Sequence, residues 1–196
     1  MSAAATQMDE LIRNRRSVFP EQYTGEPVAR AVIEKMLENA CLAPTHKLTQ
    51  PWRFIVFTGE GIKKLAVTQA EVYKAATMRD GTYRDDKHQT LLTKPLRSSH
   101  IIAIAMKRDE KRSVPEVEEI GAVFCAVENM YLTAAAYGVG CYLSTGGITY
   151  FPEAKELFEL GEEDRLIGFL HVGTPKGTPP TVRRRPVEDM VSWVDE

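Results

Sequence analysis

The longest stretch of helix-forming residues constrains the fold of this chain most. From residue 115 to about residue 137 the sequence predicts one helix, with a proline in its first turn and a glycine directly after its end. Between residues 122 and 136 this helix is apolar almost all round, interrupted mainly by Glu128 and Asn129. A helix of that composition is buried on most faces. We therefore expect it to be the central core helix of the domain or the core of a dimer interface.

Four short stretches predict strands. Residues 100–106 and 166–172 are continuously apolar, which is typical of strands that are buried on both faces. A third strand is predicted at 52–57, and a fourth leaves the long helix within 138–147 and ends in a glycine turn. Long helical segments separate consecutive strands, which argues against a simple antiparallel hairpin sheet. The order of elements predicts a mixed α/β fold in one domain, residues 1–196, without internal repeats.

Amphipathic periodicity predicts the remaining helices, and capping patterns mark some of their starts. Thr6 and Ser113 are expected to act as N-caps, because each is followed by an acidic residue three positions on. Pro44 is expected to stop the second helix. The last predicted helix contains Trp193 and has no obvious partner in a compact core, so we expect it to reach a second subunit. The predicted helices cover about residues 6–16, 26–43, 62–73, 151–158 and 187–194.

Residues 77–99 form the most polar and charged stretch between two predicted elements. One interpretation is a mobile excursion that acts as a lid over a site. The other is an exposed helical hairpin without a function. The residues alone leave both interpretations open.

Composition excludes several classes of function. The chain has 43% hydrophobic and 27% charged residues and a formal net charge of −2, so no global field favours nucleic acid or an anionic membrane. Neither a signal peptide nor a run long enough to span a membrane is expected. The three widely spaced cysteines indicate a reducing compartment, and we expect the cytoplasm. The four histidines lack metal-ligand spacing, so no metal site is predicted.

Three polar clusters are candidates for a site. The first is Arg15-Arg16-Ser17 after the first helix, which suits an anion because guanidinium groups pair bidentately with phosphate. The second is the loop from residue 45 to residue 50, held between Pro44 and Pro51, and the third is the basic run 183–185. The first two clusters also fit an ordinary solvated surface, and their local residues alone favour that interpretation.

Together these motifs resemble the nitroreductase family. The resemblance rests on Arg-Arg-Ser at 15–17, Ala-Pro-Thr-His-Lys-Leu-Thr-Gln-Pro-Trp-Arg-Phe at 43–54, Gly-Phe-Leu-His-Val-Gly-Thr-Pro at 168–175 and the late basic run. It covers nearly the whole chain and is closest in character to the small bacterial members of the YdjA type. The family holds FMN at the interface of a homodimer. The resemblance therefore implies a three-layer α+β fold, with a central mixed, mostly antiparallel sheet flanked by helices, in an intertwined homodimer.

The resemblance also implies a set of cofactor-binding residues. Arg15, Ser17, Arg183 and Arg185 match the positions for the phosphate and ribityl groups, and Arg16 matches a position beside the flavin. His46 and Gln50 match a loop that reaches the cofactor from the partner subunit. Leu143, Ser144 and Thr145 match the strand end that lines the isoalloxazine ring. Leu42 matches a position near the ring, where it could contribute only backbone or packing. No residue is assigned a catalytic role, and His46 is a candidate general acid only by its location.

The implied activity is that of an NAD(P)H oxidoreductase with a ping-pong mechanism. NADH or NADPH would deliver hydride to flavin N5, and a small nitroaromatic, quinone or enone acceptor would then take the electrons. Phe19 departs from the family pattern, because many relatives carry a lysine or arginine there that stabilises reduced flavin. A lower reduction potential is expected unless Arg16, Lys47 or another residue substitutes. The alternatives are reductive dehalogenation or flavin fragmentation on the same fold, and an FMN-binding protein with little turnover.

Overall fold

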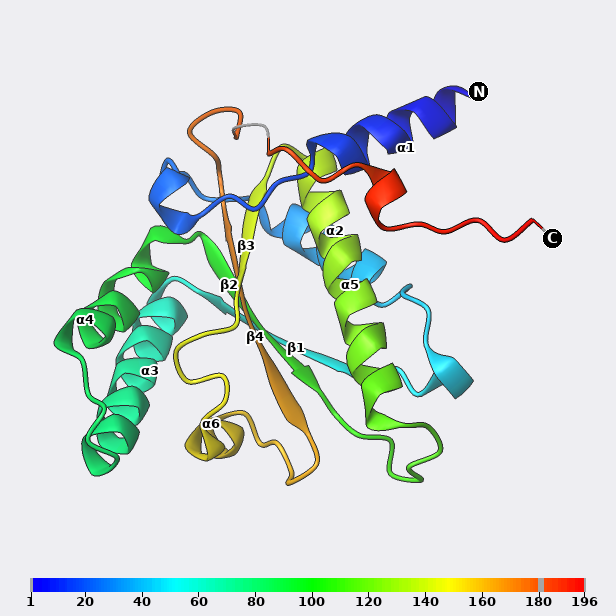
Figure 1. Cartoon of the computed structure of the whole chain (residues 1–196). Coiled ribbons are helices and arrows are strands. Elements are labelled where there is room, and N and C mark those ends of the chain that lie inside the picture. The colour runs from blue at the N-terminus through cyan, green and yellow to red at the C-terminus, as the bar shows by residue number, and fades with distance from the viewer. Residues whose placement is uncertain (1, 180–181, 196) are drawn as a thin grey trace.

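A four-stranded sheet forms the centre of the molecule, in a computed structural model that describes residues 2–179 and 182–195 (Figure 1). The strand order is β1-β2-β4-β3, and all three pairings are antiparallel. An isolated bridge between Ser17 and Cys141 adds a parallel contact at the β3 edge. The predicted α+β fold and all four predicted strands are confirmed, whereas the intertwined homodimer stays a prediction. The strands are β1 (Trp52–Thr58), β2 (His100–Met106), β3 (Gly140–Ser144) and β4 (Arg165–Gly173).

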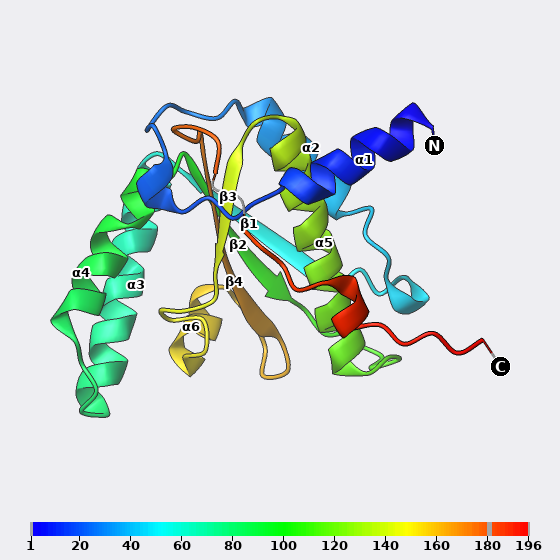
Figure 2. The same ribbon diagram turned by 45° about the horizontal axis from the view of Figure 1, so that its top comes forward.

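Helices cover both faces of this sheet and complete the three layers (Figures 1 and 2). One face packs against α2 and α5, and the other packs against α3 and α6. Helix α4 packs on α3, and α1 contacts α5. The helices are α1 (Ala3–Asn14), α2 (Arg30–Ala40), α3 (Glu60–Arg79), α4 (Asp85–Thr93), α5 (Glu116–Ala136) and α6 (Pro152–Leu157).

The alternation of side chains along the central strands explains why both faces are apolar. In β2, Ile102 and Ile104 face α2 and α5, whereas Ile101 and Ala103 face α3 and α6. The predicted burial of this strand on both faces is therefore confirmed. Helix α5 contributes nine buried residues, as expected for the central helix, but its Phe124 remains 45% exposed. An apolar part of its surface is thus left uncovered within one subunit.

Two of the predicted N-caps, Thr6 and Ser113, were wrong. In one case another residue caps the helix, and in the other the predicted cap bonds to a nearby carboxylate. Helix α1 begins at Ala3, and the side chain of Ser2, not Thr6, accepts the capping hydrogen bond from the backbone of Ala5. The Ser113 N–H and hydroxyl both donate to the Asp109 carboxylate, at 3.0 and 2.6 Å, so Ser113 closes a local loop and does not cap α5. The second helix also starts late, at Arg30. The preceding Val28 N–H donates to the Ser99 hydroxyl at 2.8 Å, which holds that segment outside the helix.

The predicted helix at 187–194 was also wrong. The structure has only one 3-10 turn there, η4 (Val187–Asp189), followed by extended and exposed chain in which Trp193 is 84% exposed. A short amphipathic segment gains too little from propensity alone to form a helix without a surface to pack on.

Residues 77–99 form a helical hairpin, which was one of the two predicted alternatives. Helix α3 extends to Arg79, and α4 returns along it before the 3-10 turn η3 (Pro95–Arg97) leads into β2. Whether this hairpin acts as a lid stays a prediction. None of the helices in the described ranges is long and apolar enough to span a membrane.

Candidate functional site

The Arg15-Arg16-Ser17 segment is fixed against the outer edge of the sheet. Beside Ser17, the Val18 N–H donates to the Cys141 carbonyl of β3 at 2.8 Å. The buried Tyr23 hydroxyl lies 2.8 Å from the Val18 carbonyl and 3.1 Å from the His171 carbonyl, so it ties the segment to β4 as well. Gly173 permits this contact, because a Cβ there would lie 2.3 Å from the Tyr23 ring. The Arg15-Arg16-Ser17 cluster is therefore held against the sheet and is not a loose surface segment.

Tyr131 of α5 joins three predicted site residues, and the sequence analysis missed it. Its hydroxyl accepts the Leu143 N–H at 2.7 Å, and the Arg15 guanidinium lies 5.3 Å from its ring centroid. Burial raises the pKa of Tyr131, while hydrogen bonding to Ser17 and to the Leu143 backbone opposes that rise. A tyrosine within an otherwise apolar helix was the available signal, because a buried hydroxyl usually finds a partner.

A cavity of about 460 Å³ brings the first and third predicted clusters together. The Arg15 Nε lies 3.4 Å from the Glu128 carboxylate, which offsets part of its charge. The Arg16 Nη1 donates to the carbonyls of Arg13 and Arg15, but its Nε is buried and has no partner among the described residues. An excess of guanidinium groups, one with an unused donor, is suited to an anion. The cavity is lined by Arg15, Arg16, Ser17, Phe19, Gln22, Pro179, Val182 and Arg184.

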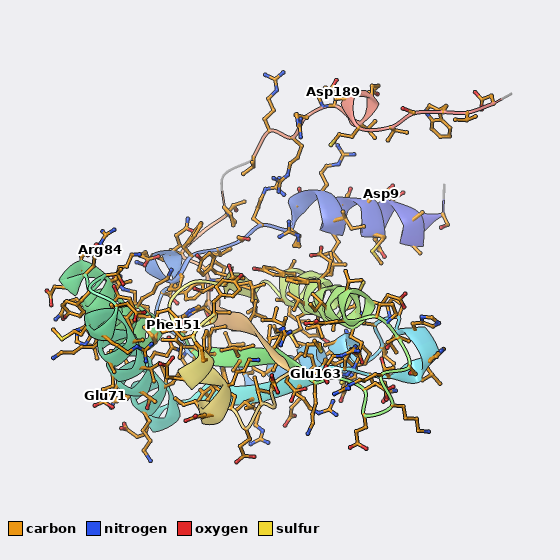
Figure 3. All side chains as sticks on the ribbon, turned by 60° about the horizontal axis from the view of Figure 1, so that its bottom comes forward. Asp9, Glu71, Arg84, Phe151, Glu163 and Asp189 are labelled. Carbon is orange, nitrogen blue, oxygen red and sulfur yellow. The ribbon has the colours of Figure 1, made fainter. Side chains whose placement is uncertain are left out.

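The late basic run contributes to this cavity through its middle residue. Arg184 lines the cavity, whereas Arg183 and Arg185 are exposed and do not. The chain that carries them lies on the same side of the molecule as α1 (Figure 3). The predicted cofactor contacts of Arg183 and Arg185 therefore stay predictions.

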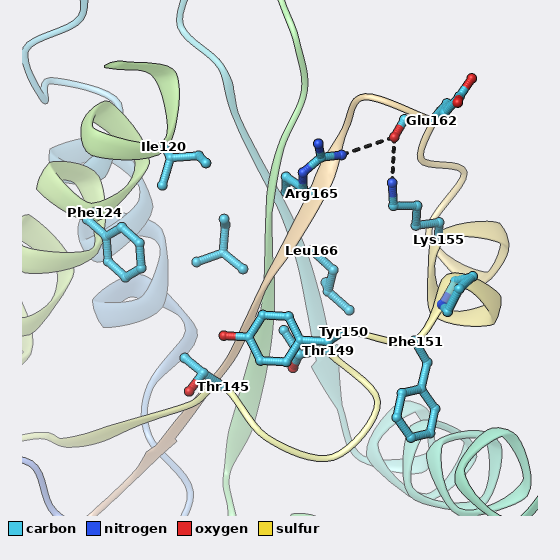
Figure 4. Close-up of a pocket in the computed structure, with 12 residues that line it drawn as sticks. Ile120, Phe124, Thr145, Thr149, Tyr150, Phe151, Lys155, Glu162, Arg165 and Leu166 are labelled. Atoms are coloured by element: carbon cyan, nitrogen blue, oxygen red, sulfur yellow. Dashed lines mark hydrogen bonds between the residues drawn. The ribbon is translucent and has the colours of Figure 1, made fainter. Parts of the chain in front are cut away.

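The predicted ring-lining strand end, Leu143 to Thr145, borders two further cavities. Ser144 lines one of about 550 Å³ beneath the α3–α4 hairpin. Thr145 lines one of about 630 Å³ beside α5 and α6, where Tyr150 and Phe124 lie at the rim (Figure 4). Gly168, opposite the register shift in β2, lets the strand end approach closely, since a Cβ there would lie 2.5 Å from the Ser144 carbonyl oxygen.

The loop with His46 and Gln50 lies at the opposite end of α5. The His46 Nδ1 pairs with the Glu118 carboxylate, and the Lys47 Nζ donates to the Ser113 carbonyl at 2.8 Å. Arg15, by contrast, contacts Glu128 further along the same helix. At 1.5 Å per residue, the two attachment points are roughly 15 Å apart. One chain therefore does not bring His46 and Gln50 to the Arg15-Ser17 segment.

The backbone of that loop is unusual. Lys47, Leu48 and Gln50 have φ angles of 51°, 55° and 46°, which non-glycine residues rarely adopt. In the sequence just before this loop, Leu42 is 78% exposed, so most of its side chain is left uncovered by the described residues. Strained backbone of this kind is found at ligand clamps and active sites. The loop therefore remains a candidate for a ligand-binding segment.

A second feature that sequence reasoning missed is a cation that contacts Tyr142, the same ring against which Phe19 packs. The Phe19 ring packs against Tyr142 with centroids 4.5 Å apart, and the Lys94 Nζ lies 4.3 Å from the Tyr142 centroid. Burial, together with the charge of Lys94, lowers the pKa of His171 to about 4. The His171 Nδ1 is 2.9 Å from the Ser98 hydroxyl, so the ring is neutral and held in place. Lys94 reaches this position only because η3 follows α4 back to the sheet.

The described residues contain no group of three or more histidine, cysteine, aspartate or glutamate side chains arranged to hold a metal ion.

Known proteins share both the sequence pattern and the fold. The sequence model of the Nitroreductase family matches residues 12–174. The "Putative NAD(P)H nitroreductase YdjA" of Escherichia coli (strain K12) is 34% identical over 170 residues, which cover 85% of this chain and 87% of that relative. A crystal structure of the "Nitroreductase-like Family Protein from Bacillus cereus" is 26% identical, has a TM-score of 0.83 and covers 96% of both chains.

One solved structure of this fold includes a cofactor. It is described as "a putative nitroreductase in complex with FMN" from Desulfovibrio desulfuricans. It is 22% identical, has a TM-score of 0.68 and covers 95% of this chain and 96% of its own. By the family match and the identity to YdjA over most of its length, this chain belongs to the nitroreductase family.

Proposed function

We propose that residues 1–196 form one FMN-binding domain of a cytoplasmic, homodimeric NAD(P)H oxidoreductase. The observation that carries this proposal is the guanidinium-lined cavity with the unpartnered Arg16 Nε. The FMN complex described for the Desulfovibrio protein of the same fold, and the NAD(P)H named in the description of YdjA, support it. The three free cysteines are consistent with a reducing compartment.

The residues of the cavity fit the phosphate of FMN. Arg15, Arg16 and Arg184 offer donors at its wall, and Ser17 adds a hydroxyl. The Arg16 Nε would gain the acceptor that it lacks, and burial without one is costly. Tyr131 would hold Leu143 and the strand end in place, so that their backbone faces the ring. When bound, FMN would supply the chemistry, by accepting hydride from NAD(P)H and passing electrons to a nitroaromatic, quinone or enone.

A second subunit would complete the site. The His46-Gln50 loop lies too far along α5 to reach the same ligand as Ser17 within one chain. Apolar side chains are left uncovered where a partner could pack, with Met8 and Ile12 of α1 exposed by 51% and 53%. Trp193 in the extended C-terminal segment is more exposed still. A twofold dimer would bury these surfaces and bring the partner's loop to the cofactor.

The absorption spectrum of the purified protein tests this function directly. We expect a yellow protein, or a colourless one that becomes yellow with added FMN, whose flavin absorbance is bleached by NADH or NADPH without oxygen. Sedimentation should give the mass of a dimer. A protein that does not take up FMN would reject the proposal. A protein whose bound FMN is not reduced by either nucleotide would favour the binding protein without turnover.

A further inference from the structure

The cavity beneath the α3–α4 hairpin has the size and the wall of a small-molecule site. Its volume is about 550 Å³, within the range of ligand pockets. Helices α3 and α4 form one side, and Ser144, Gly146 and Gly147 at the end of β3 form part of the other. It therefore adjoins the segment proposed to line the flavin ring.

The charged side chains that line this cavity are all positive. Lys87 and Lys94 line it, and no aspartate or glutamate does. The nearby carboxylates of Asp80 and Asp86 pair with arginines of the hairpin instead. Glu153 of α6 pairs with Arg79 in the same way. Within the described chain, neither lysine has a carboxylate partner. The Lys94 ammonium lies 4.3 Å from the Tyr142 ring centroid, a contact that leaves its charge without a counter-ion.

A side-chain amide adds polar atoms to the same wall. Gln69 of α3 lines the cavity, although the residue as a whole is only 6% exposed. Its amide offers both a donor and an acceptor to a bound polar molecule. Leu91, Phe151 and Phe169 supply an apolar wall in the same cavity. The wall thus combines flat apolar contact with donors of hydrogen bonds and positive charge.

We propose that this cavity is the electron-acceptor pocket and that it selects aromatic acceptors bearing an anionic group such as a carboxylate. The aromatic body would pack on Phe169 and Leu91, and the carboxylate would be held by Lys87 and Lys94. This inference rests on the proposed flavoprotein function and narrows its acceptor class. For a nitro acceptor, two electrons and one proton arrive as hydride from NAD(P)H and a second proton comes from solvent. One N–O bond breaks, which gives a nitroso compound and water.

A matched pair of acceptors tests the charge preference. We would measure kcat/KM for 4-nitrobenzoate and for neutral 4-nitrobenzamide, which has nearly the same shape. The wild type should prefer the anion, and the ratio should fall about tenfold or more in the Lys87→Met, Lys94→Met double variant, since each 1.4 kcal/mol is a factor of ten. Lys74→Met, an exposed lysine of α3 outside the cavity, is the control and should keep the wild-type ratio.

Binding without turnover gives the second readout. Benzoate should perturb the spectrum of the bound flavin and bind more tightly than benzamide, and the double variant should lose that difference. Equal use of both acceptors by the wild type would overturn the inference. So would loss of FMN from Lys94→Met, because the cavity would then be the seat of the flavin itself. Failure of the wild type to take up FMN would instead reject the proposed function. If the double variant does not fold, the two single variants carry the same test.

Discussion

The two basic segments that meet at one cavity are held in opposite ways. The Arg15-Ser17 segment is bonded to β3 and tied to β4 through Tyr23, and the side chain of Arg15 is only 19% exposed. The segment from residue 182 to 195 is exposed throughout and has a single short turn. One half of the proposed anion site is therefore fixed by hydrogen bonds within the fold. In the proposed complex, a ligand or a second subunit would fix the other half, and that ordering would be a cost of binding.

Removing a guanidinium from each segment should have the largest effect. In the Arg15→Ala, Arg184→Ala double variant, each lost charge-assisted contact should cost about 1.5–3 kcal/mol, so FMN affinity should fall roughly a hundredfold or more. The free energy of unfolding should change little by comparison. Quenching of flavin fluorescence measures the affinity, and Arg13→Ala on α1 is the matched control. Unchanged retention of FMN would reject both assignments.

Removing the Tyr23 hydroxyl should lower the stability of the protein, because this group ties the Arg15-Ser17 segment to the sheet. Tyr23→Phe leaves the carbonyls of Val18 and His171 without this donor, which should lower the free energy of unfolding by about 1–3 kcal/mol. FMN affinity should fall as well, because Ser17 loses part of its support. Urea titration measures the stability, with Tyr150→Phe, at an 80% exposed position, as the control. If both variants were equally stable, the segment would not depend on Tyr23.

Lowering the pH should reduce the stability of the folded protein, because His171 becomes protonated on unfolding. Its pKa is about 4 in the folded state and near 6.5 when unfolded, so the unfolded state binds the proton first as the pH falls. The free energy of unfolding should therefore drop by about 2 kcal/mol between pH 7 and pH 5 from this group alone. His171→Gln should remove most of that dependence. Identical pH profiles for the variant and the wild type would contradict this role.

The smallest expected effect concerns the potential of the bound flavin. In Phe19→Lys, a partly exposed cation would be added beside Tyr142 and should stabilise reduced flavin by about 1 kcal/mol, or roughly 20 mV for a two-electron couple. Spectroelectrochemistry should show this rise in Phe19→Lys and no change in Trp193→Ala. A fall in the potential of the lysine variant would show that the Phe19 position does not face the N1 edge.

Much of the fold could be predicted because it depends on local apolar pattern. The strands at residues 100–106 and 166–172 and the helix that ends near residue 137 are each fixed by a run of neighbouring residues. The wrong predictions depend on distant partners. Ser113 bonds to Asp109, and the final predicted helix has no surface to stabilise it within one chain.

The same distinction between local pattern and distant partners applies to the residues of the candidate site. Arg15 to Ser17 could be found from the sequence, because a hydroxyl beside paired arginines carries its chemistry locally. Lys94 and Gln69 could not, since they matter only once the hairpin folds back and places them over the end of β3. The role of Tyr131 could not be predicted for a related reason. Its hydroxyl accepts the backbone N–H of Leu143, and this contact forms only once α5 packs against the sheet.

The contact at Gly168 has a consequence for how this protein could be diversified. Any larger side chain would meet the Ser144 carbonyl and push the strand end away from β4, although position 168 lines neither of the two cavities that the strand end borders. A mutant library aimed at new acceptors should therefore keep codon 168 fixed while it varies the cavity wall. A rare survivor with a substitution there would alter selectivity by relocating its neighbour, and only a new structure of that survivor would reveal how.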